Sequence, residues 1–217
     1  MMKSRKCGQG IVVYVLISTL AASMMAGAPA LAASLNPRPA VEVFEFDKGH
    51  TEIRFEYDHL AMSKQSGEFR KFDGKITWDR KNIEKSSVNV VIGAASVSTG
   101  FTPLDDHLKS ADFFEVEKHP EIIFRSTKVR QIGARTGKVT GNLTIRDITR
   151  SVTLDVRFNF YGVHPLAELA ERYAGAPYAS FSARAQVLRT DFGVGLYSPG
   201  TSNKIDIVIE TELRRQN

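Results

Sequence analysis

The segment VTGNLTIRDITRSVTLDVRFNF, residues 139–160, alternates apolar and polar side chains along most of its length. In its first part Val139, Leu143 and Ile145 share one face, with Gly141 between them. The apolar positions of its second part are Val152, Leu154, Val156, Phe158 and Phe160. A period of two is typical of antiparallel strands that have one apolar and one polar face. The segment therefore predicts two such strands.

The same alternation extends to both sides of this segment. It is clear at 51–58 and 205–210, and weaker at 41–47, 67–78, 86–98, 121–132 and 178–190. Turn signals recur between the runs, at Asp73-Gly74, Gly133, Thr136-Gly137 and Tyr161-Gly162. If 41–47 and 51–58 form one bent strand, the chain has about eight strands. Eight antiparallel strands close best into a single all-β up-and-down barrel, because closure removes the exposed strand edges.

Two stretches interrupt the strand pattern and predict one or two short helical inserts. In 102–114, Thr102 is a suitable N-cap, Pro103 is a suitable first helical residue, and acidic residues follow in the first turn. Leu104 and Leu108 are four residues apart, so both are expected to face the barrel. The second stretch is 165–173, whose apolar side consists of Leu166, Leu169 and Ala170.

Residues 1–32 have the pattern of a secretory signal peptide. A basic start is followed by an uncharged, mostly apolar run at 11–25 and by the small residues Ala30 and Ala32. The alternative is an uncleaved membrane anchor, but the run is shorter than the roughly 18 to 20 apolar residues of a spanning helix. We therefore expect cleavage and a periplasmic protein that is not an integral membrane protein. Its barrel domain is expected at 41–214.

The composition excludes other classes of function. Three of the 29 basic residues and none of the 24 acidic residues lie in 1–32, so the mature chain has a net charge of +2. So small a charge gives no support to binding of nucleic acid. The single cysteine, Cys7, lies in the predicted signal peptide. The mature chain therefore offers neither a disulfide nor a reactive thiolate.

The sequence does not predict an enzyme. Its five histidines are scattered, and none has the spacing of a metal-binding motif. Asp105, Asp106 and His107 could hold a metal ion on one helical turn, but acids are common in a first helical turn without one. A glycine-rich phosphate loop and a nucleophile elbow are also missing from the sequence. We expect no catalytic residue, no metal and no cofactor, apart from a bound lipid.

Three motifs follow one another in a specific order: DDHLKSADFFEVEKHPEIIFRST at 105–127, VTGNLTIRDITRSVTLDV at 139–156 and LRTDFGVG at 188–195. Together with the opening stretch FDKGHTEIRFEYDHL, they make residues 42–213 resemble the YceI-like family of bacterial secreted proteins. The resemblance implies a lipocalin-like antiparallel barrel with a long internal pore. It also implies that a polyisoprenoid, or a related lipid such as a quinone, is threaded in the pore.

The chain departs from the family pattern in two places. Arg146-Asp147 stands where the family has a glycine turn, and 164–177 is more helical than the loop expected there. Both departures bear on the rim of the barrel, and therefore on the head group that is bound, more than on the fold.

A barrel of eight strands can be filled by its own side chains or can hold one small ligand. For the pore, the lining residues that we expect are Phe55, Tyr57, Phe124, Leu143, Val156, Phe158, Phe181, Ile207, Leu104 and Leu108. His107 and Arg189 are expected at the rim, as contacts of a head group.

The expected function is periplasmic binding or transport of a long apolar isoprenoid-type lipid, polyprenyl or quinone-like, in the barrel interior. The alternative is a structural or stress-related secreted barrel with a side-chain-filled core and no lipid cargo. An outer-membrane barrel has the same alternation with its apolar face toward lipid, but the charged residues Arg214 and Arg215 favour a soluble barrel. The sequence leaves a homodimer open.

Overall fold

The computed structural model describes residues 39–216, so the predicted signal peptide lies outside the described residues. The strands are β1 (Val41–Phe46), β2 (Glu52–His59), β3 (Ser63–Phe69), β4 (Phe72–Asp79), β5 (Ser87–Gly93), β6 (Val97–Ser98), β7 (Glu121–Gly133), β8 (Thr136–Ile145), β9 (Ile148–Val163), β10 (Pro177–Leu188) and β11 (Lys204–Arg215). Within the described residues the only α-helix is α1 (Thr102–Lys109). Short 3₁₀ helices are η1 (Ile83–Lys85), η2 (Ala94–Ser96), η3 (Glu171–Tyr173) and η4 (Arg189–Phe192). Over 39–216 we find no helix with the length and apolar character that crossing a membrane requires.

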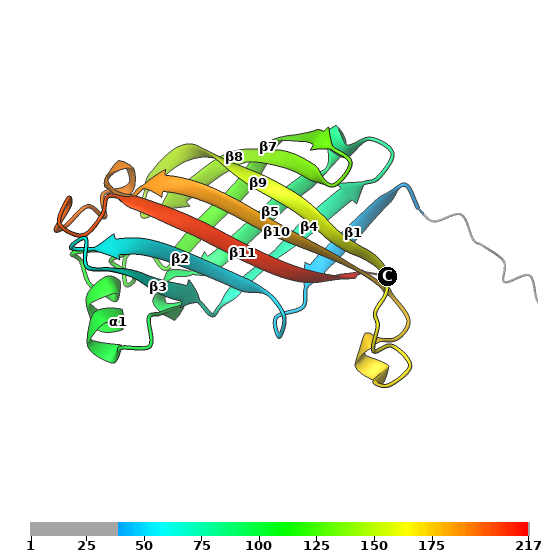
Figure 1. Ribbon diagram of the computed structural model, residues 1–217, viewed down its shortest axis with the longest axis horizontal. Helices are drawn as coiled ribbons and strands as arrows, with labels where there is room; N and C mark the ends of the chain where they lie inside the picture. Colours follow the sequence, from blue (N-terminus) through cyan, green and yellow to red (C-terminus); the bar gives the residue numbers. More distant parts are fainter. Residues whose placement is uncertain (1–38, 217) are drawn as a thin grey trace, which may run out of the picture. The chain divides into compact units, whose positions relative to one another are not determined.

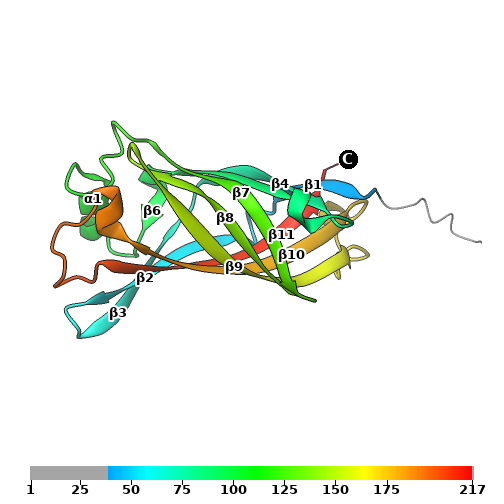
Figure 2. The ribbon, with the colours of Figure 1, turned by 90° about the horizontal axis from the view of Figure 1, so that it is seen from above.

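The strands form one antiparallel sheet that closes on itself (Figures 1 and 2). β1 and β2 both pair with β11, so they are successive parts of one bent strand, as predicted. In the same way, β3 pairs with β2 and β4 pairs with β1. On the next strand, β6 pairs with β3 and β5 pairs with β4. β3 with β4, and β5 with β6, are therefore also counted as one bent strand each. Counted in this way the barrel has eight antiparallel strands. The predicted fold class is confirmed.

The barrel has two ends, which we call the α1 end and the far end. The α1 end carries α1, the β2–β3 turn, the β8–β9 turn and the connection at 189–203. The far end carries the β4–β5 and β7–β8 connections and the connection at 164–176. Figure 1 shows these two groups of connections at opposite ends of the barrel.

β11 shows how the sequence pattern specifies a barrel wall. Ile205, Ile207 and Ile209 line the interior. On the outer face, Asp206 lies 3.5 Å from the ammonium of Lys64 on β3, and Glu210 lies 2.6 Å from the guanidinium of Arg184 on β10. The alternation predicted from sequence therefore separates an apolar lumen from charge pairs on the outside.

A bulge breaks the alternation of β9. At Asn159, β9 has one residue more than β10. Phe158 and Tyr161 both pack on Trp78, with ring centroids 5.5 Å away in each case, whereas Phe160 is exposed. The prediction that Phe160 belongs to the apolar face is wrong, because the extra residue exchanges the two faces of the strand beyond it.

α1 forms at the predicted place, but the predicted cap is wrong. The N-cap is Phe101, and Thr102 is already the first helical residue. The side chain of Phe101 has no hydrogen-bond acceptor for the N–H groups of the first helical turn. The carboxylate of Asp105 instead accepts hydrogen bonds from the backbone N–H and the hydroxyl of Thr99, at 2.6 and 2.7 Å. These bonds fasten the first turn of α1 to the chain that precedes it.

The second predicted helix, at 165–173, is wrong. The segment consists of turns followed by η3. Leu166 and Leu169 are exposed, so two of the three residues of the predicted apolar side lie in solvent. Short helices depend on packing of an apolar face, and this segment lacks that support.

Two of the predicted turns are also wrong. Asp73-Gly74 and Tyr161-Gly162 lie inside β4 and β9, whereas Gly133 and Thr136-Gly137 flank the β7–β8 turn as predicted. A Cβ at Gly74 would overlap the carbonyl oxygen of Asn89 on β5. The glycine there permits the close approach of two strands rather than a turn.

Candidate functional site

The interior of the barrel contains a cavity of about 720 Å³. Small-molecule sites in proteins have volumes of about 300–1,000 Å³. Every residue predicted for the pore and its rim lines this cavity: Phe55, Tyr57, Leu104, His107, Leu108, Phe124, Leu143, Val156, Phe158, Phe181, Arg189 and Ile207. The structure thus brings together residues from β2 to β11 and from α1. That they contact a ligand stays a prediction.

Two glycines in the wall leave room for aromatic rings inside the barrel. A Cβ at Gly67 on β3 would lie 2.8 Å from Cε1 of Phe55, its partner on β2. A Cβ at Gly141 on β8 would lie 2.8 Å from Cε2 of Phe124 on β7. Each ring therefore lies flat over the backbone of a glycine on the next strand. This arrangement keeps large apolar side chains against the wall and the lumen open.

An aromatic cluster surrounds Trp78 toward the far end. Ring centroids of Phe158, Tyr161 and Phe181 lie 5.5, 5.5 and 5.6 Å from Trp78. Phe158 and Phe181 also lie 5.6 Å from each other. Such tilted and edge-to-face pairs stabilise aromatic clusters beyond the burial of their area. The cluster provides a rigid apolar wall for that part of the cavity.

Two arginines cover rings of this cluster at the far end. The guanidinium of Arg80 lies 4.6 Å from the ring centroid of Tyr161, and that of Arg135 lies 5.3 Å from the centroid of Phe158. Both arginines line the cavity. Cation–π contacts of this kind let a charged group close an apolar space without exposing the rings to water.

A fully buried carboxylate lies beside Arg80. The side chain of Glu42 accepts a hydrogen bond from the hydroxyl of Tyr161 at 2.8 Å and from Nη1 of Arg215 at 3.2 Å. Its Oε2 lies 3.2 Å from Nε of Arg80. Burial of a charge is tolerated where it is paired and hydrogen-bonded, as here. The far end is therefore held by a polar cluster that crosses between β1, β9 and β11.

α1 and the residues after it close the opposite end. Leu104, Leu108, Phe113 and Phe114 all line the cavity. The ring of Phe114 packs edge-on against Phe69 of β3, with 5.7 Å between centroids. The prediction that the apolar stripe of α1 faces the barrel is confirmed by these positions.

His107 is the polar member of this cover. Its Nε2 lies 3.0 Å from Oδ2 of Asp112, and its ring lies 5.0 Å from that of Phe113 and 6.1 Å from that of Tyr197. Because Asp105 bonds to Thr99, it does not join His107 in one polar cluster. In the part of the chain that the structure describes, the ligand atoms of Asp105, Asp106 and His107 do not converge on one point, and the absence of a metal from this turn stays a prediction.

Arg189 is buried and fastens the connection that follows β10. Its guanidinium donates hydrogen bonds of 2.7–2.8 Å to the backbone carbonyls of Val194, Leu196, Thr201 and Ser202. Burial lowers the pKa of Arg189 from its ordinary value. Burial raises the pKa of the nearby Tyr57, and the charge of Arg189 opposes that rise. Arg189 thus shapes the rim, and its predicted contact with a head group stays a prediction.

The turn between β8 and β9 explains the departure at Arg146-Asp147. Arg146 has φ of 55°, in the left-handed region that favours glycine. Its guanidinium donates hydrogen bonds to Oε2 of Glu115 at 2.7 Å, and to the carbonyls of Phe113 and Gly193 at 3.3 and 3.0 Å. Arg146 therefore has a strained backbone conformation. Its side chain joins the segment after α1 to the segment after η4.

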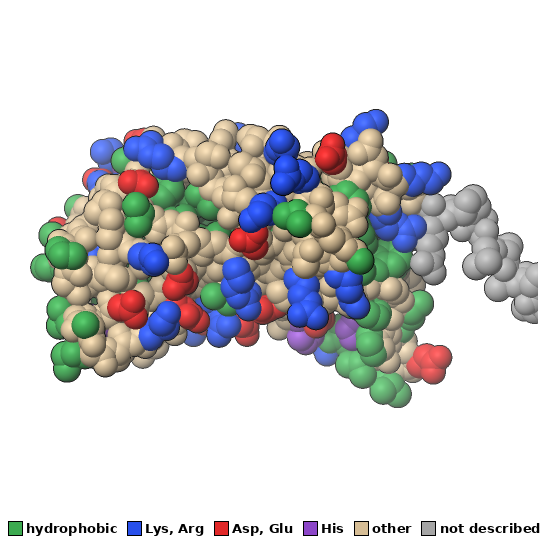
Figure 3. Space-filling model, turned by 45° about the horizontal axis from the view of Figure 1, so that its top comes forward, with side chains coloured by type: hydrophobic (Ala, Val, Ile, Leu, Met, Phe, Trp, Pro, Cys, Tyr) green, Lys and Arg blue, Asp and Glu red, His purple; other side chains and the backbone are tan. Residues whose placement is uncertain are grey.

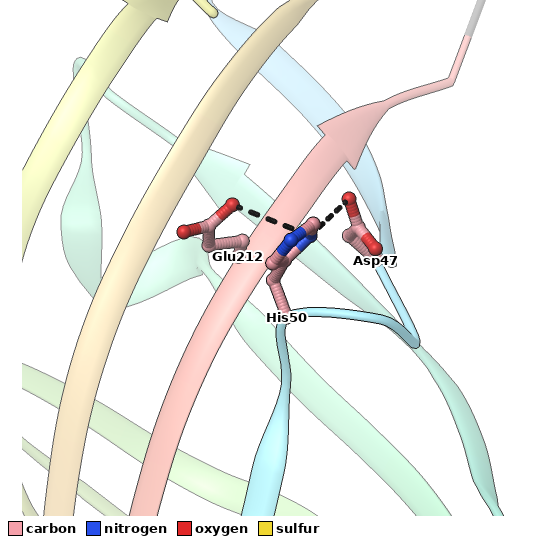
Figure 4. Close-up of side chains that lie close together, drawn as sticks. All are labelled: Asp47, His50 and Glu212. Carbon is pink, nitrogen blue, oxygen red and sulfur yellow. Dashed lines mark hydrogen bonds and ion pairs between the residues drawn. The ribbon is translucent and has the colours of Figure 1, made fainter. Parts of the chain in front are cut away.

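A group of possible metal ligands lies on the outer wall, away from the cavity. His50 lies between Asp47 and Glu212 (Figure 4), with Nδ1 3.2 Å from Oδ2 of Asp47 and 4.0 Å from Oε2 of Glu212. Sequence reasoning missed this group, because Glu212 is on β11 and the other two residues follow β1. Its shortest contact, His50 to Asp47, closes the corner between β1 and β2.

Sequence reasoning also missed several lining residues: Phe69, Trp78, Arg80, Arg135 and Phe192. Trp78 could have been found, since it is an aromatic residue in a run that already predicted a strand. Arg80 and Arg135 carry no such signal, because a cation beside a turn is usually solvated.

Comparison with known proteins agrees with this geometry. Residues 44–213 match the YceI-like domain. A UPF0312 protein of Pectobacterium carotovorum is 36% identical over 204 residues, which cover 93% of this chain and 97% of that protein. The crystal structure of a Campylobacter jejuni YceI protein aligns with a TM-score of 0.64 at 28% identity, covering 74% of this chain and 90% of that one.

A more distant structure has the same fold. A polyisoprenoid binding domain from Saccharophagus degradans aligns with a TM-score of 0.52 at 11% identity, covering 80% of this chain and 98% of that one. The domain match covers most of the chain, and the relative from Pectobacterium matches it almost from end to end. The chain belongs to the YceI-like family.

Proposed function

We propose that this protein is exported to the periplasm and binds one long apolar lipid of the isoprenoid type, polyprenyl or quinone-like, inside the barrel. The observation that carries the proposal is the cavity, whose lining consists mainly of hydrocarbon side chains. A polyprenyl chain offers only apolar surface, and each buried CH₂ group contributes about 0.8 kcal/mol. A solved relative of the same fold is described as a polyisoprenoid binding domain, which supports the ligand class.

The cavity also separates this proposal from the alternative of a side-chain-filled barrel. In a filled core the inward rings would meet one another along the whole lumen, as those of Trp78 on β4 and Phe158 on β9 do toward the far end. The rest of the lumen differs. Here the rings of Phe55 and Phe124 lie over Gly67 and Gly141, and a volume of about 720 Å³ remains between the walls. Well-packed cores leave few voids larger than a water molecule. The lipid-binding function is therefore the one that the geometry supports best.

Catalysis is not part of the proposal. The groups at the two ends are engaged in holding the barrel, as the bonds of Arg189 and Glu42 illustrate. We propose that the protein carries its ligand unchanged and needs no metal or other cofactor. A single barrel is sufficient for the proposed function, and a homodimer stays a prediction.

The experiment is a titration of delipidated protein with isoprenols of increasing chain length. If the lumen takes the chain, affinity should rise with each added isoprene unit and then level off once the cavity is full. One equivalent should bind per barrel. As a control, Phe158→Trp places a larger ring inside the barrel, and it should level off at a shorter chain. Affinity that does not depend on chain length would contradict the proposal.

A further inference from the structure

Hydrophobic side chains are exposed on the loops at the α1 end of the barrel. Met62 is 81% exposed, Phe101 and Tyr197 are each 62% exposed, and Leu60 and Leu196 are also exposed. We call these five residues the apolar rim. All of them belong to the α1 end, where Figure 3 shows hydrophobic side chains gathered at the left of the molecule. Large exposed apolar groups that gather in one place mark sites of interaction.

The residues of the rim come from three loops that lie next to one another. The backbone N–H of Leu60 donates a hydrogen bond to the carbonyl of Gly200 at 3.0 Å, which joins the β2–β3 turn to the 189–203 connection. The ring of Tyr197 lies 6.1 Å from that of His107 on α1. Phe101 is the N-cap of the same helix. The three loops thus form one surface.

This surface lies beside the part of the cavity that α1 covers. Tyr197 belongs to the rim and also lines the cavity. His59 lines the cavity and immediately precedes Leu60, and Leu104 and Leu108 line it from α1. A chain that leaves the lumen at this end would therefore pass directly between the rim residues.

The backbone holds apolar side chains on the β2–β3 turn in spite of strain. Leu60 and Ala61 each have φ of 54°, and Tyr197 has φ of 64°. For residues other than glycine this left-handed region is unfavourable. The positive φ values of Leu60 and Ala61 belong to the tight β2–β3 hairpin turn, which the bond from the N–H of Met62 to the carbonyl of His59 closes at 2.9 Å, but the isolated barrel gains nothing from exposed apolar side chains there.

We propose that the apolar rim docks on the surface of a lipid bilayer, so that the cargo passes between bilayer and lumen without crossing water. The proposal rests on the proposed function, since a bilayer is the phase in which an isoprenoid lipid is dissolved. The composition of the rim favours insertion of apolar side chains into the bilayer over electrostatic attraction to charged head groups. Two cations near this end are already paired: Lys64 lies 3.5 Å from Asp206, and Lys109 lies 3.5 Å from Asp106.

The test compares two charged variants at opposite ends of the barrel. In the double variant Leu60→Glu with Met62→Glu, both changes lie on the exposed β2–β3 turn. The control is Leu169→Glu, because Leu169 is also 81% exposed but lies at the far end. Co-sedimentation with vesicles of phosphatidylcholine, with and without phosphatidylglycerol, measures docking. We expect the double variant to bind at least about tenfold more weakly than the native protein, and the control to bind like it.

Loading from detergent micelles, which offer the lipid without a bilayer, separates this inference from the proposed function. If the double variant loads an isoprenol from micelles like the native protein but fails to acquire it from vesicles, docking is supported. If neither the native protein nor any variant loads from micelles, the proposed function is overturned. Vesicle binding would still test whether the apolar rim docks on a bilayer. Phe101→Glu, on another loop, should repeat the loss if the double variant folds poorly.

Two results would overturn the inference. The first is equal vesicle binding by the native protein and the double variant, or an equal loss in Leu169→Glu. The second is that the native protein does not bind vesicles but forms dimers in sedimentation equilibrium, while the double variant forms no dimers. That result would assign the rim to a second copy of the chain.

Discussion

The hydroxyl of Tyr161 on β9 donates a hydrogen bond of 2.8 Å to Oε1 of Glu42 on β1, although these two strands are not neighbours in the sheet. The bond therefore crosses the interior of the barrel instead of following its wall. The far end of the barrel is therefore held by a polar contact between two strands on opposite parts of the wall.

Removal of this bond should destabilise the fold. Tyr161→Phe keeps the ring against Trp78 but leaves the buried carboxylate of Glu42 with one donor fewer. Hydrogen bonds to charged groups contribute about 1.5–3 kcal/mol, so we expect a loss of that size in the free energy of unfolding, measured with urea. Tyr197→Phe, at the exposed rim, is the matched control and should change stability by less than about 0.5 kcal/mol. Equal losses of unfolding free energy in the two variants would show that the contact between Tyr161 and Glu42 has no special role in stability.

Gly67→Ala should reduce the usable length of the lumen. The new methyl group takes the space over which the ring of Phe55 now lies, so the ring has to turn toward the lumen. We expect a lower stoichiometry or a shorter optimal isoprenol in the chain-length titration, with strand content unchanged by circular dichroism. Gly93→Ala serves as control, since a Cβ there meets only ordinary contacts at 3.5 Å or more. If the titration of Gly67→Ala matches that of the native protein, the glycine does not keep the lumen open.

Stability should fall at alkaline pH because of Tyr57. Burial raises the pKa of its phenol above the ordinary value of 10.0. As the pH rises past about 10, the unfolded chain loses this proton before the folded chain does, so the unfolding free energy decreases with pH. Tyr178, whose pKa burial also raises, acts in the same direction.

The measurement is urea unfolding between pH 9 and pH 11, values that bracket the ordinary tyrosine pKa of about 10. Tyr57→Phe should make the decline shallower, and Tyr57→Phe with Tyr178→Phe should make it shallower still. An unchanged slope in both variants would mean that other groups govern the alkaline limit.

Leu108→Asp tests whether α1 is a movable cover. A carboxylate placed on the apolar contact of Leu108 opposes docking of the helix on the cavity, because the charge has no partner there. We expect the off-rate of a bound isoprenol to rise while strand content stays the same. Asp106→Asn, on the exposed side of α1, should leave the off-rate as it is. A folded Leu108→Asp protein with the native off-rate would show that α1 is a fixed wall.

Much of the fold could be predicted from the sequence, since period-two alternation is a local property. The runs around 139–160 and 205–210 identify β8, β9 and β11, and the idea of one bent strand anticipated how β1 and β2 share β11. The errors arose where a single residue changes the pattern. The bulge at Asn159 moved Phe160 outward, and the exposed Leu166 and Leu169 left the second helix without a surface to pack on.

The lining of the cavity was predicted more completely than its ends. Inward positions follow from alternation, so Phe55, Phe124 and Ile207 could be named in advance. The contacts that close the ends join residues far apart in sequence, such as Glu42 with Arg215 and Arg146 with Glu115. No local pattern indicates these pairs. The open lumen itself depends on glycines opposite aromatic rings, which requires knowledge of strand register.

The most direct test of the central claim is the content of the native barrel. The protein is purified from its native cells without added lipid, denatured, extracted with organic solvent and analysed by mass spectrometry. Our account predicts one equivalent of an isoprenoid-type lipid per chain, and clearly less from a Gly67→Ala protein purified in parallel. A native protein that yields no lipid, and whose delipidated form binds no isoprenol of any length, would contradict the account.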